Sequence, residues 1–302
     1  MNRRPQIALL PDGKRLHLQD GPIDLVIEAK GSELDVRTAY EAASLRFTGL
    51  LDELCAELGE LRKAADPART VLKGVVARRM HAAVVPFATE QFITPMAAVA
   101  GSVAEEILCA MRGAAQLDRA YVNNGGDIAL HLTGEQRFTI ALMDRPDRLG
   151  VLQSISIEAG DSARGIATSG RHGRSFSLGI ADAVTVLART AAQADAAATI
   201  IANAVDLPGH PAIVRVPANE LQPDSDLGER LVTRDVGALL ESEIEDALQA
   251  GADRARQLLV ADLIEGAALR LLGETVRVGA IGNRAEAQPV PRRAAIEGVA
   301  HV

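Results

Sequence analysis

The chain has 302 residues, of which 48% are hydrophobic and 24% charged, the composition of a packed globular protein. Its net charge of −8 argues against a general nucleic-acid or anionic-membrane surface, so an anionic ligand would need a local site. Aromatic residues make up only 2% and Trp is absent, which leaves few rings on which a base or sugar could stack.

The cysteines and the apolar runs indicate the cellular compartment of the protein. Cys55 and Cys109 lack the spacing of a metal site, and we expect them to be reduced thiols in the core. The start of the sequence has too few apolar residues for a signal peptide. No run approaches the roughly 18 apolar residues of a membrane helix. We therefore expect a soluble, cytoplasmic protein.

The first part of the chain predicts strands followed by helices. Turn signals within residues 5–30 predict short antiparallel strands. Leucines at helical spacing predict one long helix over residues 35–64, which Pro67 ends. Residues 70–84 fit either a helix or a strand. Residues 94–113 predict a further helix, with proline at its first helical position.

The second part of the chain predicts a cluster of strands and then helices. Residues 119–134 read as two strands that flank a glycine pair. The alanine-rich residues 193–205 predict a helix, and residues 235–272 are expected to be predominantly helical. Further strands are predicted within residues 137–143, 152–159, 164–188, 212–232 and 274–282.

Strand clusters separated by helices predict an α+β fold, with a mainly antiparallel sheet flanked by helices. We expect residues 1–282 to form a single domain, with two intertwined subdomains as an alternative arrangement. From about Asn283 the sequence is Ala, Pro and Arg without periodicity. Residues 283–302 are therefore predicted to be a mobile tail.

The first candidate site segment is the sequence Asn-Asn-Gly-Gly-Asp at residues 123–127. Consecutive glycines let the backbone adopt positive φ or approach a ligand closely. Asn124 and Asp127 would then supply an amide and an acceptor beside Gly125 and Gly126. The structural alternative is a plain hairpin turn, because Asn-Gly is a strong signal for a two-residue turn.

The second segment, residues 168–175, combines glycines, hydroxyls, arginines and a histidine. Backbone N–H groups of a glycine-rich turn together with arginines could form an anion-binding concavity. A solvated surface loop is the alternative. His172 could act as an acid–base group or simply be polar surface. The candidate residues here are Thr168, Ser169, Gly170, Arg171, His172 and Arg174.

The third segment is a polar stripe on the alanine-rich helix. Asp195, Thr199 and Asn203 stand at i, i+4 and i+8, so they line one face. A carboxylate and a hydroxyl one turn apart are hard oxygen ligands that suit Mg²⁺, which completes its octahedron with phosphates and water. Alternatively, Asp195 caps a helix start and Thr199 bonds back to a carbonyl. Together, the three segments supply the parts of a nucleotide pyrophosphate site.

Five motifs, in this order, give the chain a resemblance to a bacterial and archaeal branch of the ApbE-like superfamily. The similarity is close over about residues 80–206 and looser from 20 to 280. The motifs are PMAAVAGSVAE (95–105), NNGGDI (123–128), TSG (168–170), SFSLGIADAVTV (175–186) and ADAAATIIANAV (194–205).

The resemblance implies a fold, a reaction and a set of site residues. ApbE proper is a Mg²⁺-dependent flavin transferase that cleaves FAD and places FMN on a Thr or Ser hydroxyl; some relatives hydrolyse FAD to FMN and AMP. The family's metal-binding Asp and Thr match Asp195 and Thr199. Its glycine turns match residues 125–127 and 169–170. A backbone carbonyl near the family's A-x-A-K-G element points to Ala98, or to Ala97, as a further metal ligand.

The chain also departs from the transferases. Their glycine turn is followed by a His-x-x-Asp-Pro-x-Thr-Gly element, whereas residues 174–179 here read RSFSLG. The family lysine is replaced by Ala100. The transferases are commonly exported and lipid-anchored, while no export signal is recognised here. These departures put transfer in doubt more than flavin or nucleotide binding.

We therefore hypothesise a Mg²⁺-dependent enzyme acting on FAD, which either transfers FMN to a protein hydroxyl or hydrolyses the pyrophosphate. Arg171 or Arg174 would stabilise the developing charge, and His172 would be the default base. The alternatives are a non-catalytic flavin or nucleotide binding protein and an enzyme for another phosphorylated molecule. Tyr121, Phe176 and Phe92 are the candidates to stack a flavin ring. A homodimer is compatible with the alanine-rich helices, and neither a nucleic acid nor a membrane is an expected partner.

Overall fold

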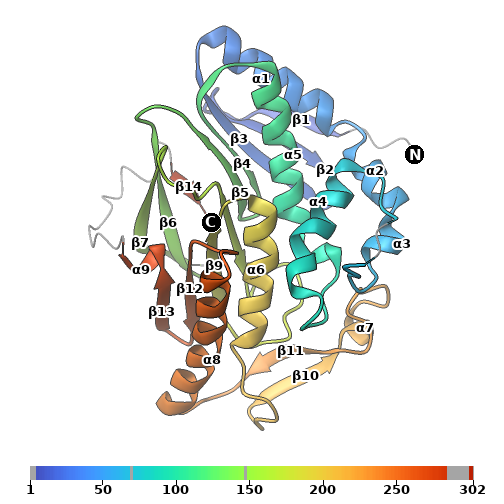
Figure 1. The fold of residues 1–302 in the computed structure, drawn as a ribbon, viewed down its shortest axis with the longest axis vertical. Helices are drawn as coiled ribbons and strands as arrows, with labels where there is room; N and C mark the ends of the chain where they lie inside the picture. The colour runs from blue at the N-terminus through green and yellow to red at the C-terminus, as the bar shows by residue number, and fades with distance from the viewer. Residues whose placement is uncertain (1–4, 69–70, 146–147, 284–298, 302) are drawn as a thin grey trace.

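A nine-stranded sheet, in which every pairing is antiparallel, forms the centre of the molecule (Figure 1). The computed structural model describes residues 5–68, 71–145, 148–283 and 299–301. The strand order is β1-β2-β3-β4-β5-β8-β9-β12-β13. The strands are β1 Gln6–Leu9, β2 Leu16–Asp20, β3 Ile23–Gly31, β4 Leu117–Asn124, β5 Asp127–Leu132, β8 Gly165–Ser169, β9 Ala183–Ala188, β12 Gly266–Leu271 and β13 Glu274–Gly279.

Helices cover one face of this sheet (Figure 1). Two apolar clusters lie between them and the sheet, one under α1, α4 and α5 and the other under α6 and α8. In the described part of the chain, no helix is both long and apolar enough to cross a bilayer. The helices are α1 Glu33–Phe47, α2 Leu50–Ala56, α3 Leu58–Leu61, α4 Val75–Val84, α5 Val99–Ala114, α6 Ala191–Ala204, α7 Ala218–Leu221, α8 Glu241–Val260 and α9 Ala280–Asn283, with 3₁₀ turns η1 Val85–Phe87 and η2 Pro95–Ala98.

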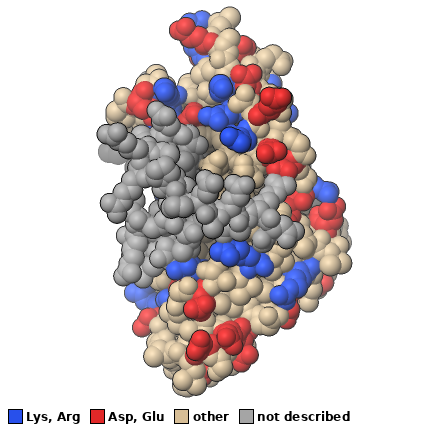
Figure 2. Space-filling model, turned by 90° about the vertical axis from the view of Figure 1, so that its left-hand side faces the viewer, with Lys and Arg blue, Asp and Glu red and all other residues tan. Residues whose placement is uncertain are grey.

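A small second sheet packs on the opposite face of the large one. It consists of β6 (Arg137–Arg145), β7 (Arg148–Glu158) and β14 (Val299–His301), and its apolar residues contact β4, β5 and β8. On the described part of the face drawn in Figure 2, Lys and Arg stand among Asp and Glu and form no continuous basic surface. A separate two-stranded sheet joins β10 (Ile213–Pro217) to β11 (Leu231–Val236).

The predicted α+β class with a mainly antiparallel sheet flanked by helices is confirmed. The core position expected for Cys55 and Cys109 is wrong, because both residues are exposed on the outer side of their helices. Residues 70–84, which fitted a helix or a strand, contain α4. The prediction that residues 235–272 are predominantly helical is wrong at their end, because α8 stops at Val260 and β12 follows. β12 pairs with β9 and β13, so sheet pairing decides the conformation there.

The single long helix predicted over residues 35–64 is wrong. The chain forms three helices, and the first break lies at Thr48 and Gly49, where Gly49 has φ +83°. That left-handed conformation suits glycine and ends a helix. Leucine spacing survives across such a break because the helices cover the same face, so periodicity alone does not reveal it.

The single domain over residues 1–282 remains a prediction. The mobile tail predicted for residues 283–302 lies outside the described residues except for Asn283 and β14. β14 pairs in parallel with β6, from Val299 opposite Thr139 to His301 opposite Ala141.

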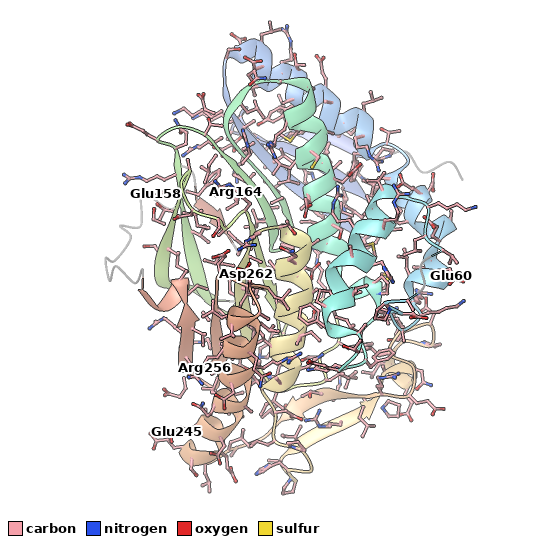
Figure 3. The ribbon with its side chains drawn as sticks, viewed as in Figure 1. Glu60, Glu158, Arg164, Glu245, Arg256 and Asp262 are labelled. Carbon is pink, nitrogen blue, oxygen red and sulfur yellow. The ribbon has the colours of Figure 1, made fainter. Side chains whose placement is uncertain are left out.

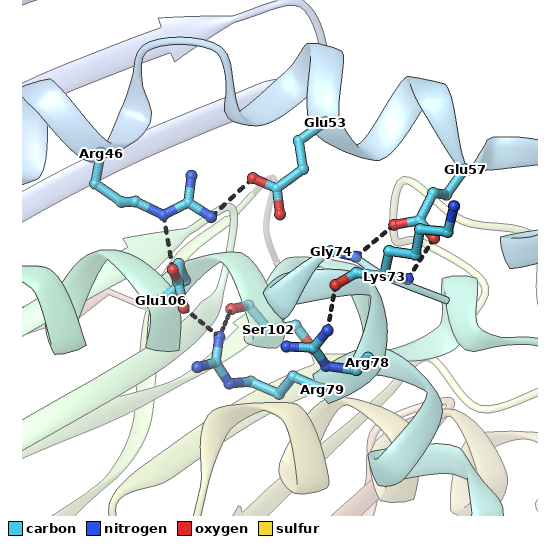
Figure 4. Close-up of polar contacts among 9 residues, drawn as sticks. All are labelled: Arg46, Glu53, Glu57, Lys73, Gly74, Arg78, Arg79, Ser102 and Glu106. Atoms are coloured by element: carbon cyan, nitrogen blue, oxygen red, sulfur yellow. Dashed lines mark hydrogen bonds and ion pairs between the residues drawn. The ribbon is translucent and has the colours of Figure 1, made fainter. Parts of the chain in front are cut away.

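Ion pairs connect the helices that lead to the site (Figure 4). Glu106 on α5 accepts hydrogen bonds from Arg46 of α1 at 2.7 Å and from Arg79 of α4 at 2.9 Å. Glu105 contacts Arg79 at 3.2 Å and accepts the N–H of Ala192, at the start of α6, at 3.4 Å. The network therefore fixes α5 relative to three other helices. Charges elsewhere on the helices, such as the labelled Glu60 of α3, project outward (Figure 3).

We predict that Glu106→Gln lowers the free energy of unfolding by about 1–3 kcal/mol at pH 7, because two partly buried guanidinium groups lose their carboxylate. Burial alone would raise the pKa of Glu106, but hydrogen bonds from Arg46 and Arg79 hold it below its ordinary value. A depressed carboxyl pKa stabilises the fold above the unfolded pKa, and the contribution disappears as the pH falls through the folded one. Urea denaturation at pH 7 and pH 3.5 should therefore show the difference shrinking in acid.

The matched control is Glu60→Gln, which removes an exposed carboxylate of α3 whose one ion-pair partner among the described residues is Lys63, just past the end of that helix. Its effect should stay within about 0.5 kcal/mol. Equal effects of the two substitutions would contradict the structural role assigned to Glu106.

Candidate functional site

The glycine pair forms the tip of the β4–β5 hairpin. Asn124 pairs with Asp127 across the strands, so Gly125 and Gly126 are the two-residue loop. Their φ angles are +65° and +115°, and two positive φ values in succession are what this turn requires. The N–H of Gly126 donates to Asn123 Oδ1 at 2.8 Å. The hairpin interpretation is confirmed. Asp127 is the first residue of β5, directly after the turn.

Asp127 joins the hairpin to the second candidate segment. Its Oδ1 accepts the N–H of Thr168, at the end of β8, at 3.2 Å. Burial raises the pKa of Asp127 to about 7, although the Thr168 N–H and the nearby charge of Arg174 act in the opposite direction. Desolvation thus outweighs the partners that favour the carboxylate, which is how a carboxyl group with insufficient compensation behaves.

Asp195 lies in α6 but does not cap it. The N-cap of α6 is Thr190, which accepts the N–H of Gln193 at 3.2 Å. Asp195 Oδ2 instead accepts the N–H of Gly101, in the first turn of α5, at 2.9 Å. A Cβ on Gly101 would lie 2.2 Å from the carbonyl oxygen of Ala191, so glycine at this position allows α5 and α6 to approach. Asp195 therefore caps a helix start, as the structural alternative predicts, but the helix is α5 and not its own helix α6.

Asp127 and Asp195 form an acidic pair. Burial, and then the charge of Asp127, raise the pKa of Asp195 well above its ordinary value. Among the described residues, no Lys, Arg or His side chain makes an ion pair with either carboxylate. Two partly buried carboxylates that repel each other and lack a paired cation have the donor chemistry for a divalent cation.

The rest of the candidate donor set consists of oxygen atoms. In the described part of the chain, no group of three or more His, Cys, Asp or Glu side chains is arranged around a metal position. The Thr199 hydroxyl, one helical turn after Asp195, has no hydrogen-bond partner among the described residues. Mg²⁺ is held by one or two carboxylates and completes its shell with water and phosphate. These residues therefore fit a magnesium ion better than zinc.

The third member of the polar stripe has a structural role. Asn203 Oδ1 accepts the N–H of Leu178 at 3.0 Å and so anchors the loop that leads to β9. Asn124, which is buried, similarly donates from Nδ2 to the Ala100 carbonyl at 3.1 Å and holds the hairpin against the start of α5. Ala98, at the N-cap of α5, lies on the same segment. The hairpin, α5 and α6 thus meet at one place.

Arg174 lies over the hairpin tip. A Cβ on Gly125 would be 3.4 Å from the guanidinium carbon of Arg174, so the arginine packs against the glycine backbone. Its Nη1 reaches the Pro22 carbonyl at 3.4 Å, and its side chain is otherwise exposed. The arginine is the positive group of the second segment that lies beside the acidic pair.

Arg171 and His172, from the same segment, contact Asp182 instead. Arg171 Nε and His172 Nε2 lie 2.9 and 3.2 Å from Asp182 Oδ1, while Asp182 Oδ2 accepts the N–H of Leu272 at 2.6 Å. Gly170 packs against the Asp182 backbone. Sequence reasoning missed Asp182, because no local pattern signals a carboxylate whose partners come from other turns. Thr168 Oγ1 bonds Thr185 at 2.9 Å, and Ser169 is half-buried at the end of β8.

The candidate aromatic residues have different environments. Tyr121 is buried and makes an edge contact with Phe138. Phe92 is covered by the guanidinium of Arg230, 3.2 Å from the ring centroid. Phe176 is 36% exposed and follows Arg174 by two residues, so it is the ring of the three that could meet a ligand at the hairpin.

The chain is similar in sequence to known proteins. The family model described as "AbpE bacteria" matches residues 7–278. A UPF0280 protein of Methanopyrus kandleri is 36% identical over 183 residues, which cover 60% of this chain and 69% of that protein. A UPF0280 protein of Methanothermobacter thermautotrophicus is 38% identical over 117 residues, covering 38% of this chain and less than half, 44%, of the relative.

Two solved structures resemble the fold at low sequence identity. The ApbE protein of Thermotoga maritima superposes with a TM-score of 0.49 and 13% identity, covering 93% of this chain and all of that one. The Pseudomonas stutzeri flavinyl transferase ApbE, in its apo form, gives a TM-score of 0.45 and 11% identity, covering 96% and 100%.

The acidic pair predicts an unusual pH dependence. Because the pKa of Asp127 is raised to about 7, the folded protein keeps a proton that the unfolded chain releases near pH 3.8. The contribution of this retained proton to the free energy of unfolding is complete below the unfolded pKa and is lost as the pH rises through about 7. In a chelator, Asp127→Asn should therefore exceed the wild type in unfolding free energy at pH 8 by on the order of 1–3 kcal/mol.

Urea denaturation at pH 4.5 and pH 8 tests this expectation, with the exposed Asp253→Asn as control. The unfolding free energies of the wild type and Asp127→Asn should converge at pH 4.5. Added Mg²⁺ should stabilise only proteins that retain both carboxylates of the acidic pair. If the unfolding free energies of the wild type and Asp127→Asn changed with pH in parallel, the acidic pair would not destabilise the fold at high pH.

Proposed function

The chain belongs to the family described as "AbpE bacteria", and from that premise we propose that it is a Mg²⁺-dependent enzyme acting on FAD at the β4–β5 hairpin. The observation that carries the proposal is the acidic pair of Asp127 and Asp195, which makes no ion pair with a cationic side chain among the described residues. The pair lies where a glycine turn, a helix start and an arginine meet. Glycine turns, helix starts and arginines are groups that bind the phosphates of a nucleotide.

The residues that would hold the ion are Asp195, Thr199 and Asp127, with the backbone carbonyl of Ala98 as a further candidate. Bound Mg²⁺ would supply neutralisation of the negative charge on a pyrophosphate. The backbone N–H groups of Gly101 and Ala100 fix the orientation of the Asp195 carboxylate at the start of α5. Asn124 keeps the hairpin and the start of α5 together, so the two carboxylates stay at the same place.

Arg174 would bind the nucleotide phosphates. Its guanidinium is exposed above Gly125, and the absence of side chains on Gly125 and Gly126 lets a phosphate or ribose approach the backbone. Ser169, Thr168 and Gly170 would border the same ligand. Phe176 offers the exposed ring against which an isoalloxazine could stack.

His172 is the proposed proton acceptor for an attacking hydroxyl. Its Nε2 hydrogen-bonds Asp182, which is the arrangement of a base with an orienting carboxylate. Arg171 contacts the same carboxylate and so fixes the loop. The attacking group is a protein hydroxyl in FMN transfer or water in FAD hydrolysis; both give AMP as the other product.

A flavin or nucleotide binding protein without turnover is the alternative. The loss of the His-x-x-Asp-Pro element favours it, as does the engagement of both Arg171 and His172 with Asp182. The two functions differ in a single readout, the release of AMP.

Asp195→Ala should lower AMP release from FAD and Mg²⁺ roughly 100-fold or more, because it removes a ligand of the ion. Chromatographic assay of AMP, with and without a hydroxyl-bearing acceptor peptide, measures the effect. Asp253→Ala removes an exposed carboxylate of α8 and should leave the rate unchanged. Intact bound FAD with no AMP from the wild type would support the binding protein, and equal rates for Asp195→Ala and wild type would exclude the metal assignment.

Arg174→Ala should reduce AMP release roughly 10- to 100-fold, since a charge-assisted phosphate contact is lost. Because the metal ligands are intact, binding of Mg²⁺ measured by calorimetry should not weaken. Arg174→Lys should recover part of the activity, and the exposed Arg256→Ala serves as control. An Arg174→Ala protein with normal KM and kcat would place the phosphates elsewhere.

A further inference from the structure

An apolar groove lies at the edge of the large sheet, at the end of β3 away from the hairpin site. Its volume is about 940 Å³, and its walls come from β1, the end of β3, and α1. The apolar part of the lining is Ile7, Leu9, Leu16, Ala29, Val36 and Leu45. The groove takes no part in the function proposed above.

The apolar face of β2 continues onto strand β1, where its side chains are exposed. Ile7 pairs with Leu18 and Leu9 with Leu16, so these side chains share one face of the sheet. The β2 residues on this face are buried, while Ile7 is 44% and Leu9 57% exposed. β1 is also an edge strand and contains neither a charged residue nor a proline. Natural edge strands usually carry such residues to prevent pairing with another chain.

A protruding apolar residue stands beside the hollow. Leu45, in the last part of α1, lines the groove and is 79% exposed. A surface that offers a protrusion and a hollow side by side can match a copy of itself across a two-fold axis, because each protrusion then enters the other hollow. A small ligand would account for the hollow but not for Leu45.

The charges at the groove also suit a copy of the same surface. Four cationic side chains and three anionic ones line it, in a chain whose net charge is −8. Lys14 and Lys30 make no ion pair with any described carboxylate. A surface with both signs can place its cations opposite the anions of its copy, whereas a surface of one sign would repel it.

We propose that this surface is a two-fold interface between two copies of the chain. In it β1 pairs antiparallel with the β1 of the second copy, and Leu45 of each copy enters the groove of the other. The free edge of the sheet, the exposed Ile7 and Leu9, and the protruding Leu45 are then buried together. The hairpin site lies outside this surface, so the proposal is independent of the proposed function.

Light scattering on a size-exclusion column, at roughly 50 μM protein because association follows mass action, tests the interface. The wild type should have twice the 31.8 kDa mass of one chain. Leu45→Glu and Ile7→Lys should each halve the measured mass, because each places a charge in the apolar contact. Both side chains are exposed in the single chain, so the variants should fold.

Val260→Glu is the matched control, since Val260 is 89% exposed at the end of α8 and lies outside the groove. It should keep the mass of the wild type. A wild type with the mass of one chain, or a dimer that survives both Leu45→Glu and Ile7→Lys, would overturn the proposal. A monomer that binds decanoate or an apolar peptide only when Leu45 is present would assign the groove to that ligand and would also overturn it.

Discussion

The close approach of α5 and α6 is the constraint on which the site depends. Gly101 lets the backbone of α5 touch the carbonyl of Ala191, a contact that a Cβ would prevent. At this distance the Gly101 N–H reaches Asp195, a carboxylate that would otherwise be surrounded by alanine. Ion pairs among α1, α4 and α5 support the same geometry from the other side of the helix layer. A helix built from alanine is thus a means of bringing one carboxylate to the start of another helix.

Local patterns in the sequence predict local geometry well. The two-residue turn at Gly125 and Gly126 follows from backbone sterics alone, and hence the hairpin could be placed before the structure was known. The break at Gly49 shows where this reasoning fails, because helices on both sides of the break keep the same apolar face. β12 is a second case: its partners β9 and β13 determine that it is a strand.

The candidate site was predictable in its residue types but not in its pairings. Helical spacing placed Asp195 and Thr199 on one face, yet the partner of Asp195 lies in a helix 94 positions away in sequence. Its repulsion with Asp127 likewise depends on how β5 and α6 pack. Asp182 is the clearest omission, since it collects Arg171, His172 and the backbone of Leu272 from separate turns. Contacts of that kind arise from the tertiary fold and leave no periodic trace.

One polar stripe on α6 therefore serves two purposes. At one end, Asn203 accepts the N–H of Leu178 and anchors the chain on its way into β9, the strand after the Arg174 loop. Nearer its start, Asp195 accepts the N–H of Gly101 next to the hairpin, and Thr199 follows one turn later on the same face. Because the alanines between them are small, neighbouring backbone can approach the helix from either side. The spacing that looked like a single ligand set is better explained as an anchor and the proposed metal site, which the same buried helix carries one to two turns apart.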